Sequence, residues 1–502
     1  MPVTFDFEIC SQLEVLRQRI AKRDDIPRQL YPIIEGYLRD GGGRLLQAAG
    51  QPYLWDGIDH VIYEIALSSS RWTAFLYGRF RLVPSELLTR HLTTMLAGHA
   101  LAHGDEVQGE RFVYFDKDEL VLYVSDYDGH SYRLDGSAEV AVVDNGTGVL
   151  FFDDDGGRHV VDPDIGNHGE LAPTLIGDLE FASTTAGGMT PDDQRRLLTF
   201  WMYAIAFGGI LPAKPVLIAE GSPGSGKSCF LQRLQYCLHG AQRARSIGKE
   251  DEADFGVLLM RTPIAVLDDV NGYIEWLQNA LCAYVTGASW ARRKKYSDAD
   301  EVVIQPRAFL AFTSKNPVTF RRDDIADRSI IIRLERREAS GFQPLSLLLE
   351  QVDARRPRLF GEWLWNLNQI VRRIRAGMPA APTTYRMADF ARIALVIGEV
   401  LGYSPDEIAG TLEAAQAERE AFLWEADSLP DLLGTWVKTE ANSSREVRPM
   451  DLFRELAELA EKNRVTFYRK VDQLARRLRG GIVGFEIVRV ESSDGPTYRI
   501  GR

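Results

Sequence analysis

The chain has 502 residues, a formal net charge of −12, 45% hydrophobic residues and 26% charged residues. This length exceeds what one hydrophobic core usually organises, so we expect several domains. The composition is that of an ordinary globular protein, which excludes a mostly disordered chain, a coiled-coil rod and a small disulfide scaffold. No run of about 18 apolar residues occurs, and the opening MPVTFDFEIC resembles neither a signal peptide nor a membrane anchor. We therefore expect a cytoplasmic protein with no membrane partner.

The charge is unevenly distributed along the chain. Residues 101–165 contain 16 acidic and 4 basic residues, whereas residues 443–502 contain 13 basic and 9 acidic residues. Because phosphate groups respond to local charge, the acidic total does not exclude a nucleic-acid partner.

Cysteine and histidine spacing predicts neither a disulfide framework nor a zinc site. The four cysteines form no CxxC pair, and the eight histidines show neither HExxH nor HxH spacing. We expect reduced and mostly buried thiols.

The first two parts of the chain carry no clear chemical motif. Residues 1–105 show helical periodicity, and residues 106–185 read as an acidic β-rich module with short apolar runs between turn signals. Asp126 and Asp128 follow an apolar strand and would suit a polymerase-type metal site, but we favour an acidic hairpin turn. The acidic run 153–155 is likewise interpreted as a solvated turn.

Residues 186–342 alternate strands and helices, a pattern that indicates an α/β fold with a largely parallel sheet. Thr190 followed by Pro191 predicts a helix start. Residues 343–428 read as helical, and residues 429–502 read as helices followed by a β-pair around the turn 493–495.

A phosphate-binding loop is predicted between a strand and a helix in this α/β segment. GSPGSGKS fits the pattern G-x-x-x-x-G-K-[ST], whose glycines let backbone N–H groups point at phosphate oxygens. Lys227 would pair with the β and γ phosphates of ATP, and Ser228 would ligate Mg²⁺. The residues assigned to ATP binding are Gly221, Ser222, Pro223, Gly224, Ser225, Gly226, Lys227, Ser228 and Cys229.

A second strand delivers paired carboxylates about forty residues later. In PIAVLDDV, Asp268 and Asp269 end an apolar run, where one carboxylate would hold the metal and the other would orient or deprotonate the attacking water. We assign Asp268 to the metal and Asp269 to the water, with the reverse assignment left open.

Two further residues are candidates for sensing or stabilising the γ-phosphate. Asn316 ends the strand RAFLAFTSKNP and would hold the lytic water, the alternative being an Asn-Pro turn that closes the strand. Arg328 precedes the strand RSIIIRL and would reach a neighbouring subunit's ATP, with Arg321 and Arg322 as reserves. The alternative for Arg328 is a surface arginine in a local ion pair.

Between these strands lies a basic run flanked by aromatic residues, which suits single-stranded nucleic acid. Its alternative interpretation is a solvated strand edge. The candidate contacts are Arg292, Arg293, Lys294, Lys295 and Tyr296.

The order of these motifs resembles the superfamily 3 helicases, and most closely the primase-helicase ATPases of phages, poxviruses and mobile elements. GSPGSGKS, AVLDDV, TGASWARRKKY, FLAFTSKNP and DDIADRSIIIRL carry the resemblance over about 110 residues. It implies an AAA+ fold, ATP and Mg²⁺, a hexameric ring, single-stranded or forked DNA, replication or mobile-element partner proteins, and translocation along DNA during replication. By position, it matches Asn316 to the sensor and Arg328 to the arginine finger.

The chain departs from the family in two places. No primase motif is evident upstream, and Lys315 stands where the family favours a plainer Thr-Ser-Asn ending. The tail is similar to the winged-helix ends of such proteins, where Lys470, Arg476, Arg477 and Arg479 would face phosphates, the alternative being a small helical lid.

The sequence thus predicts a multidomain α/β protein with an AAA+ ATPase core, an N-terminal α+β region and a C-terminal winged-helix-like domain. The leading functional hypothesis is an ATP-dependent DNA helicase or translocase. The alternative is a nucleotide-dependent switch or assembly ATPase that recruits partners without unwinding.

Overall fold

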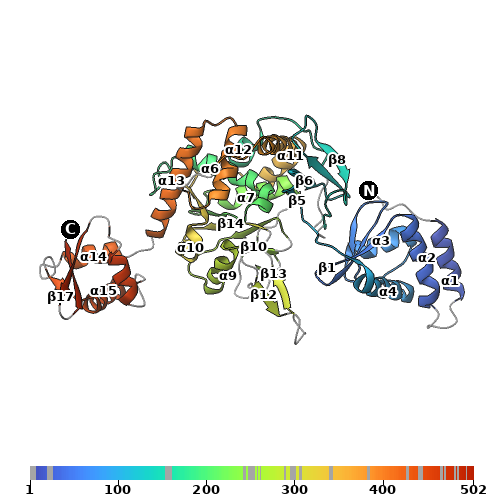
Figure 1. Cartoon of the computed structure of the whole chain (residues 1–502), viewed down its shortest axis with the longest axis horizontal. Coiled ribbons are helices and arrows are strands. Elements are labelled where there is room, and N and C mark those ends of the chain that lie inside the picture. Colours follow the sequence, from blue (N-terminus) through green and yellow to red (C-terminus); the bar gives the residue numbers. More distant parts are fainter. Residues whose placement is uncertain are drawn as a thin grey trace. The chain divides into compact units, whose positions relative to one another are not determined.

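Figure 1 shows a computed structural model of the chain. It divides into two compact units, one of residues 1–320 with 324–418 and the other of residues 321–323 with 419–502. Every helix in the described ranges is too short or too polar to cross a lipid bilayer. The structure describes residues 7–19, 26–152, 161–240, 245–246, 255–256, 258–259, 262–287, 290–293, 301–304, 308–337, 343–380, 385–424, 429–438, 445–463, 467, 471–479, 482, 485–492 and 495–501.

The N-terminal part contains a sheet as well as helices, so the helical expectation for residues 1–105 was wrong in part. Its four strands have the order β3-β2-β1-β4. In β1 and β2 the leucines Leu46 and Leu54 are fully buried, while most of their neighbours are half-exposed. One buried leucine in so short a segment does not distinguish the alternation of a strand from the apolar face of a helix. The elements are α1 (Phe7–Arg19), α2 (Ile26–Asp40), β1 (Arg44–Ala48), β2 (Gln51–Trp55), β3 (Ile62–Glu64), α3 (Ser70–Phe80), α4 (Leu87–His103) and β4 (Asp105–Glu106).

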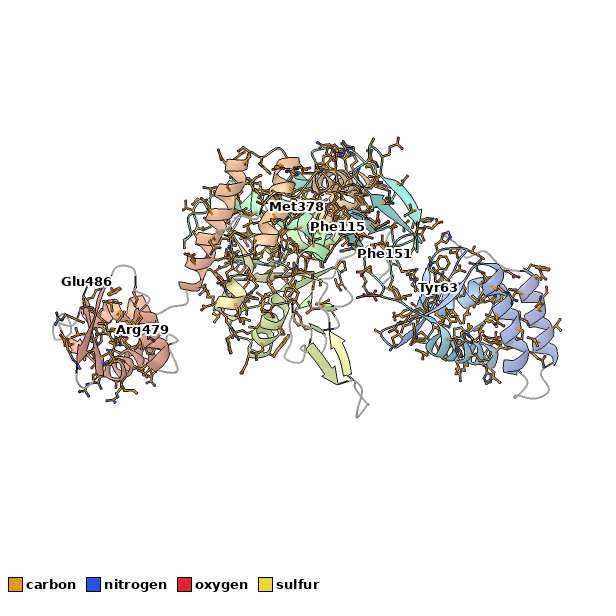
Figure 2. The ribbon with its side chains drawn as sticks, in the orientation of Figure 1. Tyr63, Phe115, Phe151, Met378, Arg479 and Glu486 are labelled. Atoms are coloured by element: carbon orange, nitrogen blue, oxygen red, sulfur yellow. The ribbon has the colours of Figure 1, made fainter. Side chains whose placement is uncertain are left out.

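The β-rich module is an antiparallel meander with strand order β5-β6-β7-β8. Its strands are β5 (Val113–Asp116), β6 (Val121–Ser125), β7 (His130–Leu134) and β8 (Ala141–Asp144). The apolar run at 149–152 forms no strand beyond a bridge between Phe151 and Glu110. Phe115 packs edge-on against Phe207, so the module shares the large central core (Figure 2).

A five-stranded sheet with order β10-β11-β14-β9-β15 forms the centre of the first unit, and all its strand pairs are parallel. This confirms the predicted parallel sheet. The three inner strands are almost completely buried, as parallel strands between two helical layers are. The strands are β9 (Val216–Gly221), β10 (Arg245–Ser246), β11 (Ile264–Asp268), β14 (Phe309–Ser314) and β15 (Ser329–Leu334).

Helices pack around this sheet, with α6 against α12 and the long α11 against both α7 and α12 (Figure 1). Residues 343–428 were predicted to be helical, and their second half forms two helices that are separated at residues 401–404. The remaining elements of the unit are α5 (Leu171–Ile176), α6 (Pro191–Ala204), η2 (Ile205–Ile210), α7 (Lys227–His239), α9 (Glu275–Val285), β12 (Trp290–Arg293), β13 (Glu301–Ile304), η3 (Val318–Phe320), α10 (Asp323–Ala326), α11 (Leu345–Arg375), α12 (Ala388–Val400) and α13 (Pro405–Trp424).

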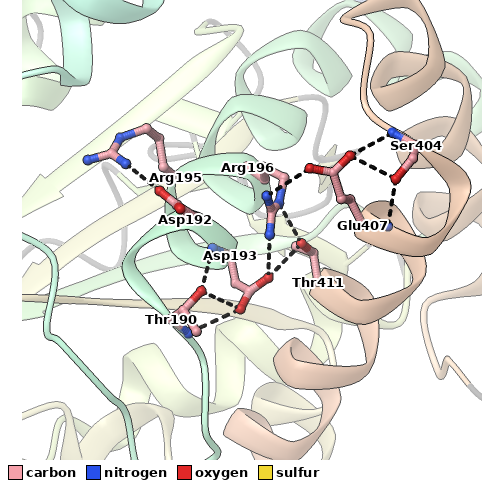
Figure 3. Close-up of polar contacts among 8 residues, drawn as sticks. All are labelled: Thr190, Asp192, Asp193, Arg195, Arg196, Ser404, Glu407 and Thr411. Atoms are coloured by element: carbon pink, nitrogen blue, oxygen red, sulfur yellow. Dashed lines mark hydrogen bonds and ion pairs between the residues drawn. The ribbon is translucent and has the colours of Figure 1, made fainter.

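The start of α6 is tied to α13 by a polar network (Figure 3). Thr190 caps α6, and its side chain and that of Asp193 form a reciprocal capping box, which confirms the predicted helix start. Arg196 donates to Asp193 at 2.9 Å and to the hydroxyl of Thr411 on α13 at 2.9 Å. This network joins two helices that are more than two hundred residues apart in sequence.

In its described residues, the second unit contains α14, α15, α16 and an antiparallel sheet of order β16-β18-β17 around an apolar core. The β-pair expected near the end of the chain is present as β17 and β18. The elements are α14 (Leu429–Val437), β16 (Glu446–Val447), α15 (Pro449–Asn463), α16 (Val471–Arg479), β17 (Glu486–Ser492) and β18 (Gly495–Gly501).

Candidate functional site

The carboxyl ends of β9, β11 and β14 bring the predicted loop, the acidic pair and the strand end of Asn316 to one edge of the sheet. Parallel strands place their carboxyl ends on the same edge, where open α/β sheets bind ligands. β14 lies between β9 and β11, so the acidic pair is separated from the glycine-rich loop by one strand rather than adjacent to it.

The loop between β9 and α7 requires its glycines. Gly224 and Gly226 have φ values of +85° and +86°, which side-chain-bearing residues rarely adopt. At Gly221, a Cβ would lie 2.5 Å from the carbonyl oxygen of Leu334. Gly226 stands at the start of α7, so the loop leads directly into a helix N-terminus, where an anion is favoured.

Two side chains of the loop leave polar groups for a ligand. The Ser225 hydroxyl is fully buried and has no hydrogen-bond partner among the described residues. Lys227 is 9% exposed, and its Nζ donates to the carbonyl oxygen of Ser222 at 3.3 Å. Burial lowers the pKa of Lys227, whereas the carboxylates of Asp268 and Asp269 oppose that shift. The carboxylates of the acidic pair therefore favour the charged form of the Lys227 amine.

Asp268, at the end of β11, contacts side chains from α7 and from β14. Its Oδ1 accepts a hydrogen bond of 2.6 Å from the Ser228 hydroxyl, which comes from the first turn of α7. The same oxygen accepts a short bond from the hydroxyl of Thr313 on β14. A serine hydroxyl and a carboxylate oxygen in contact are ligands that suit Mg²⁺.

Two residues that were not among the predicted site residues, Thr313 and Asn271, hold Asp269 in position. Its backbone N–H donates to Thr313 Oγ1 at 2.8 Å, and its Oδ1 accepts from Asn271 Nδ2 at 2.6 Å. Its φ of +57° lies in the left-handed region, so the backbone turns sharply at the end of β11. Neither Thr313 nor Asn271 had a motif-based signal, since their roles depend on strand order.

Asn316 lies in the loop that follows β14. Its backbone N–H donates to Asn271 Oδ1 at 3.2 Å, and its carbonyl oxygen accepts from Gly272 N at 2.9 Å. The side chain of Asn316 is exposed. Lys315 also donates its backbone N–H to Asn271 Oδ1, so Asn271 connects the loop after β14 to Asp269.

An arginine pair lies on the other side of the loop. Asp178 accepts 2.6 Å hydrogen bonds from both Arg233 on α7 and Arg337 after β15. A Cβ at Gly226 would lie 3.0 Å from a terminal nitrogen of Arg337. Cys229, in the first turn of α7, has a pKa raised by burial. Arg337 had no motif-based signal in the sequence.

The arginine-finger candidates lie before β15. Arg328 is half-buried and donates to the carbonyl oxygen of Asp324 at 3.1 Å. Arg322 is exposed, and the guanidinium of Arg321 lies 5.1 Å from the ring centre of Phe422. The finger assignment concerns a neighbouring subunit and stays a prediction.

The first two residues of the basic run lie in β12, which pairs antiparallel with β13, so that Arg292 is opposite Val302 and Arg293 is opposite Glu301. Lys294, Lys295 and Tyr296 lie outside the described residues, as does Lys470 in the tail. In α16, the exposed Arg479 donates to the carbonyl oxygen of Ala475 in its own helix.

Asp126 forms the expected turn. Its Oδ1 accepts from the backbone N–H groups of Asp128 and His130 at 2.7 and 2.9 Å. Since these bonds close the β6–β7 turn, the acidic-turn interpretation is confirmed. The run 153–155 lies outside the described residues.

A family model described as the actinomycete integrative conjugative element replication protein matches residues 194–405. Over this range, which contains the glycine-rich loop, the acidic pair and the strand end of Asn316, the chain is similar to replication proteins of mobile elements. No curated protein matches the chain.

Several solved structures of the C-terminal region of NrS-1 resemble the chain at low identity. An A-form apo structure aligns with a TM-score of 0.43 and 13% identity, covering 94% of this chain and 98% of that one. An apo structure of NrS-1 residues 305–718 aligns with a TM-score of 0.41 and 12% identity, covering 94% and 98%.

Proposed function

We propose that the chain is an ATP-dependent DNA helicase or translocase of superfamily 3 type that serves replication of a mobile element. The observation that carries the proposal is the contact between Ser228 and Asp268, where Ser228 follows Lys227 directly at the start of α7. The sheet order supports an AAA+ core, because one inserted strand separates the loop strand from the acidic strand. The family match over residues 194–405 supports the replication role.

The residues at the sheet edge fit ATP and Mg²⁺. The positive φ values of Gly224 and Gly226 give the loop the curvature with which backbone N–H groups can face phosphates, and the buried Ser225 hydroxyl lacks a partner among the described residues. Bound MgATP would supply the phosphoanhydride whose hydrolysis drives movement. Lys227 would neutralise the terminal phosphates, and Ser228 with Asp268 would hold the metal.

Asp269 would orient or deprotonate the attacking water. Thr313 and Asn271 fix its backbone and its carboxylate, so water activation depends on the position of β14 relative to β11. Asn316 would hold the same water at this edge of the sheet. Arg328 would stabilise the transition state across a subunit boundary in a hexameric ring, and the β12–β13 hairpin would contact single-stranded DNA.

Steady-state ATP hydrolysis with and without single-stranded DNA tests the proposal. We expect hydrolysis that DNA stimulates, that rising salt weakens and that Lys227→Ala abolishes. Lys117→Ala, which changes an exposed lysine of the β-rich module, is the matched control and keeps wild-type hydrolysis. Hydrolysis that depends on Lys227 but not on DNA would favour a nucleotide-dependent switch instead. Hydrolysis unaffected by Lys227→Ala would overturn the proposed site.

A further inference from the structure

A cluster of two histidines and one aspartate lies far from the sheet edge described above. His60 is in the β2–β3 turn, His130 begins β7 and Asp144 ends β8. One potential ligand atom from each lies within 4.8 Å of the others. His60 Nδ1 is 3.3 Å and His130 Nε2 is 4.0 Å from Asp144 Oδ1.

The backbone brings these three side chains together from separate segments. His130 and Asp144 are directly paired across β7 and β8, so their side chains share one face of the meander. His60 is presented by a tight turn in which its own φ is +56°. A Cβ at Gly129 would lie 2.2 Å from the carbonyl oxygen of Asp59, so only glycine permits this approach of the two turns.

Neighbouring residues orient the ligands. Asp126 Oδ2 lies 3.3 Å from His130 Nδ1, which favours the tautomer with the proton on Nδ1 and a lone pair on Nε2. Trp55 stacks on the ring of His60, and its Nε1 donates to the carbonyl oxygen of Asn145, next to Asp144. A carboxylate behind one imidazole is the arrangement found around metal-ligating histidines.

The charges favour a cation in the cluster. His130 Nε2 lies 4.0 Å and His60 Nδ1 lies 3.3 Å from the Asp144 carboxylate, so a cation held among these atoms would be coordinated by two imidazole nitrogens and a negatively charged oxygen. Metal bonds of about 2.0–2.2 Å in a tetrahedral site place ligand atoms roughly 3.3–3.6 Å apart. The distance from His60 Nδ1 to Asp144 Oδ1, 3.3 Å, fits this spacing, and the distance from His130 Nε2 to the same oxygen, 4.0 Å, is somewhat longer. Two imidazoles with one carboxylate suit Zn²⁺ better than Mg²⁺ or Ca²⁺.

We propose that His60, His130 and Asp144 form a Zn²⁺ site that ties the N-terminal sheet to the β-rich module. The side chain of Asp144 is 55% exposed, which gives the ion a path from solvent and leaves a fourth position for water. The site replaces the sequence-based expectation of no zinc site, and it is independent of ATP hydrolysis.

Metal counting on the full-length chain tests the site. The chain is stripped with a chelator and dialysed against Zn²⁺, and bound metal is counted; Co²⁺ is added to a second sample and its visible spectrum is recorded. Wild type is expected to bind one more Zn²⁺ than the double variant His60→Ala/His130→Ala. Asp126→Asn, which removes no ligand, is expected to weaken binding by about 10–100-fold.

His168→Ala is the matched control. His168 Nε2 lies 3.6 Å from the carboxylate of Asp164, but among the described residues this pair is not part of a group of three possible metal ligands. This variant should bind as much Zn²⁺ as wild type. The melting temperature of wild type should rise with Zn²⁺ while that of the double variant does not. Should the double variant fail to fold, Asp144→Asn provides the same comparison from an exposed position. Equal Zn²⁺ binding by wild type and the ligand variants would overturn the proposal.

Discussion

The Ser228 hydroxyl donates a 2.6 Å hydrogen bond to Asp268 Oδ1 across 40 residues of sequence. This bond joins the first turn of α7 to the end of β11, and Thr313 on β14 donates to the same carboxylate oxygen. The carboxylate of Asp268 is therefore positioned by two neighbouring elements, α7 and β14.

Thr313→Val is expected to lower kcat for ATP hydrolysis by about 10–100-fold. Valine keeps the shape of the buried threonine but removes its hydrogen bonds to the Asp268 carboxylate and from the Asp269 N–H. Steady-state ATPase measurements at saturating Mg²⁺ check this. Thr286→Val is the control, since that exposed hydroxyl bonds only to carbonyls of its own helix. Equal kcat values for both variants would contradict the role of Thr313.

Asn271→Asp is expected to reduce kcat while nucleotide binding stays near wild type. The new carboxylate keeps an acceptor for the backbone N–H groups of Lys315 and Asn316, but it replaces the donor at Asp269 by a like charge. Binding of a fluorescent ATP analogue and single-turnover hydrolysis separate the two effects. Loss of nucleotide binding with unchanged hydrolysis per bound ATP would contradict the assignment.

Arg337→Ala is expected to raise KM for ATP by about 10-fold or more. The guanidinium lies beside Gly226 and is held there by Asp178, so it would add a charged donor near the phosphates. The neighbouring Arg336 is exposed, and Arg336→Ala should leave KM unchanged. If Arg337→Ala and Arg336→Ala have the same KM for ATP, Arg337 does not contribute to nucleotide binding.

Asp193→Asn is expected to destabilise the first unit at pH 7 by about 1 kcal/mol, with the difference shrinking in acid. Burial raises the pKa of Asp193, but hydrogen bonds from Thr190, Arg196 and Thr411 outweigh it, so the net pKa is lowered. A lowered folded-state pKa stabilises the protein above the unfolded value of about 3.9, and that stability is lost as pH falls through the folded pKa.

Thermal melting at pH 7 and pH 3 checks this dependence. Asp192→Asn is the control, because Asp192 is 76% exposed and pairs only with Arg195 on the surface. A stability difference between Asp193→Asn and wild type that is the same at both pH values would show that the carboxylate charge is not what stabilises the network.

Sequence by itself determined the features that depend on neighbouring residues. The alternation of strands and helices predicted the parallel sheet, and Thr190 followed by Pro191 predicted the start of α6, because a cap is satisfied within one helical turn. The glycines of the loop at 221–226 and the paired aspartates were visible for the same reason, since each motif is a short contiguous pattern.

Only the tertiary structure decided which of these motifs meet. Because β14 lies between β9 and β11, Thr313 contacts Asp268, and Asn271 contacts the loop that contains Asn316. No local sequence pattern encodes this order of strands. The short strands β1 and β2 were missed because each buries few side chains. His60, His130 and Asp144 lie together because of the register of β7 with β8 and the packing of two turns. Burial of distant side chains sets that register, so the spacing of the three residues in the sequence does not reveal the cluster.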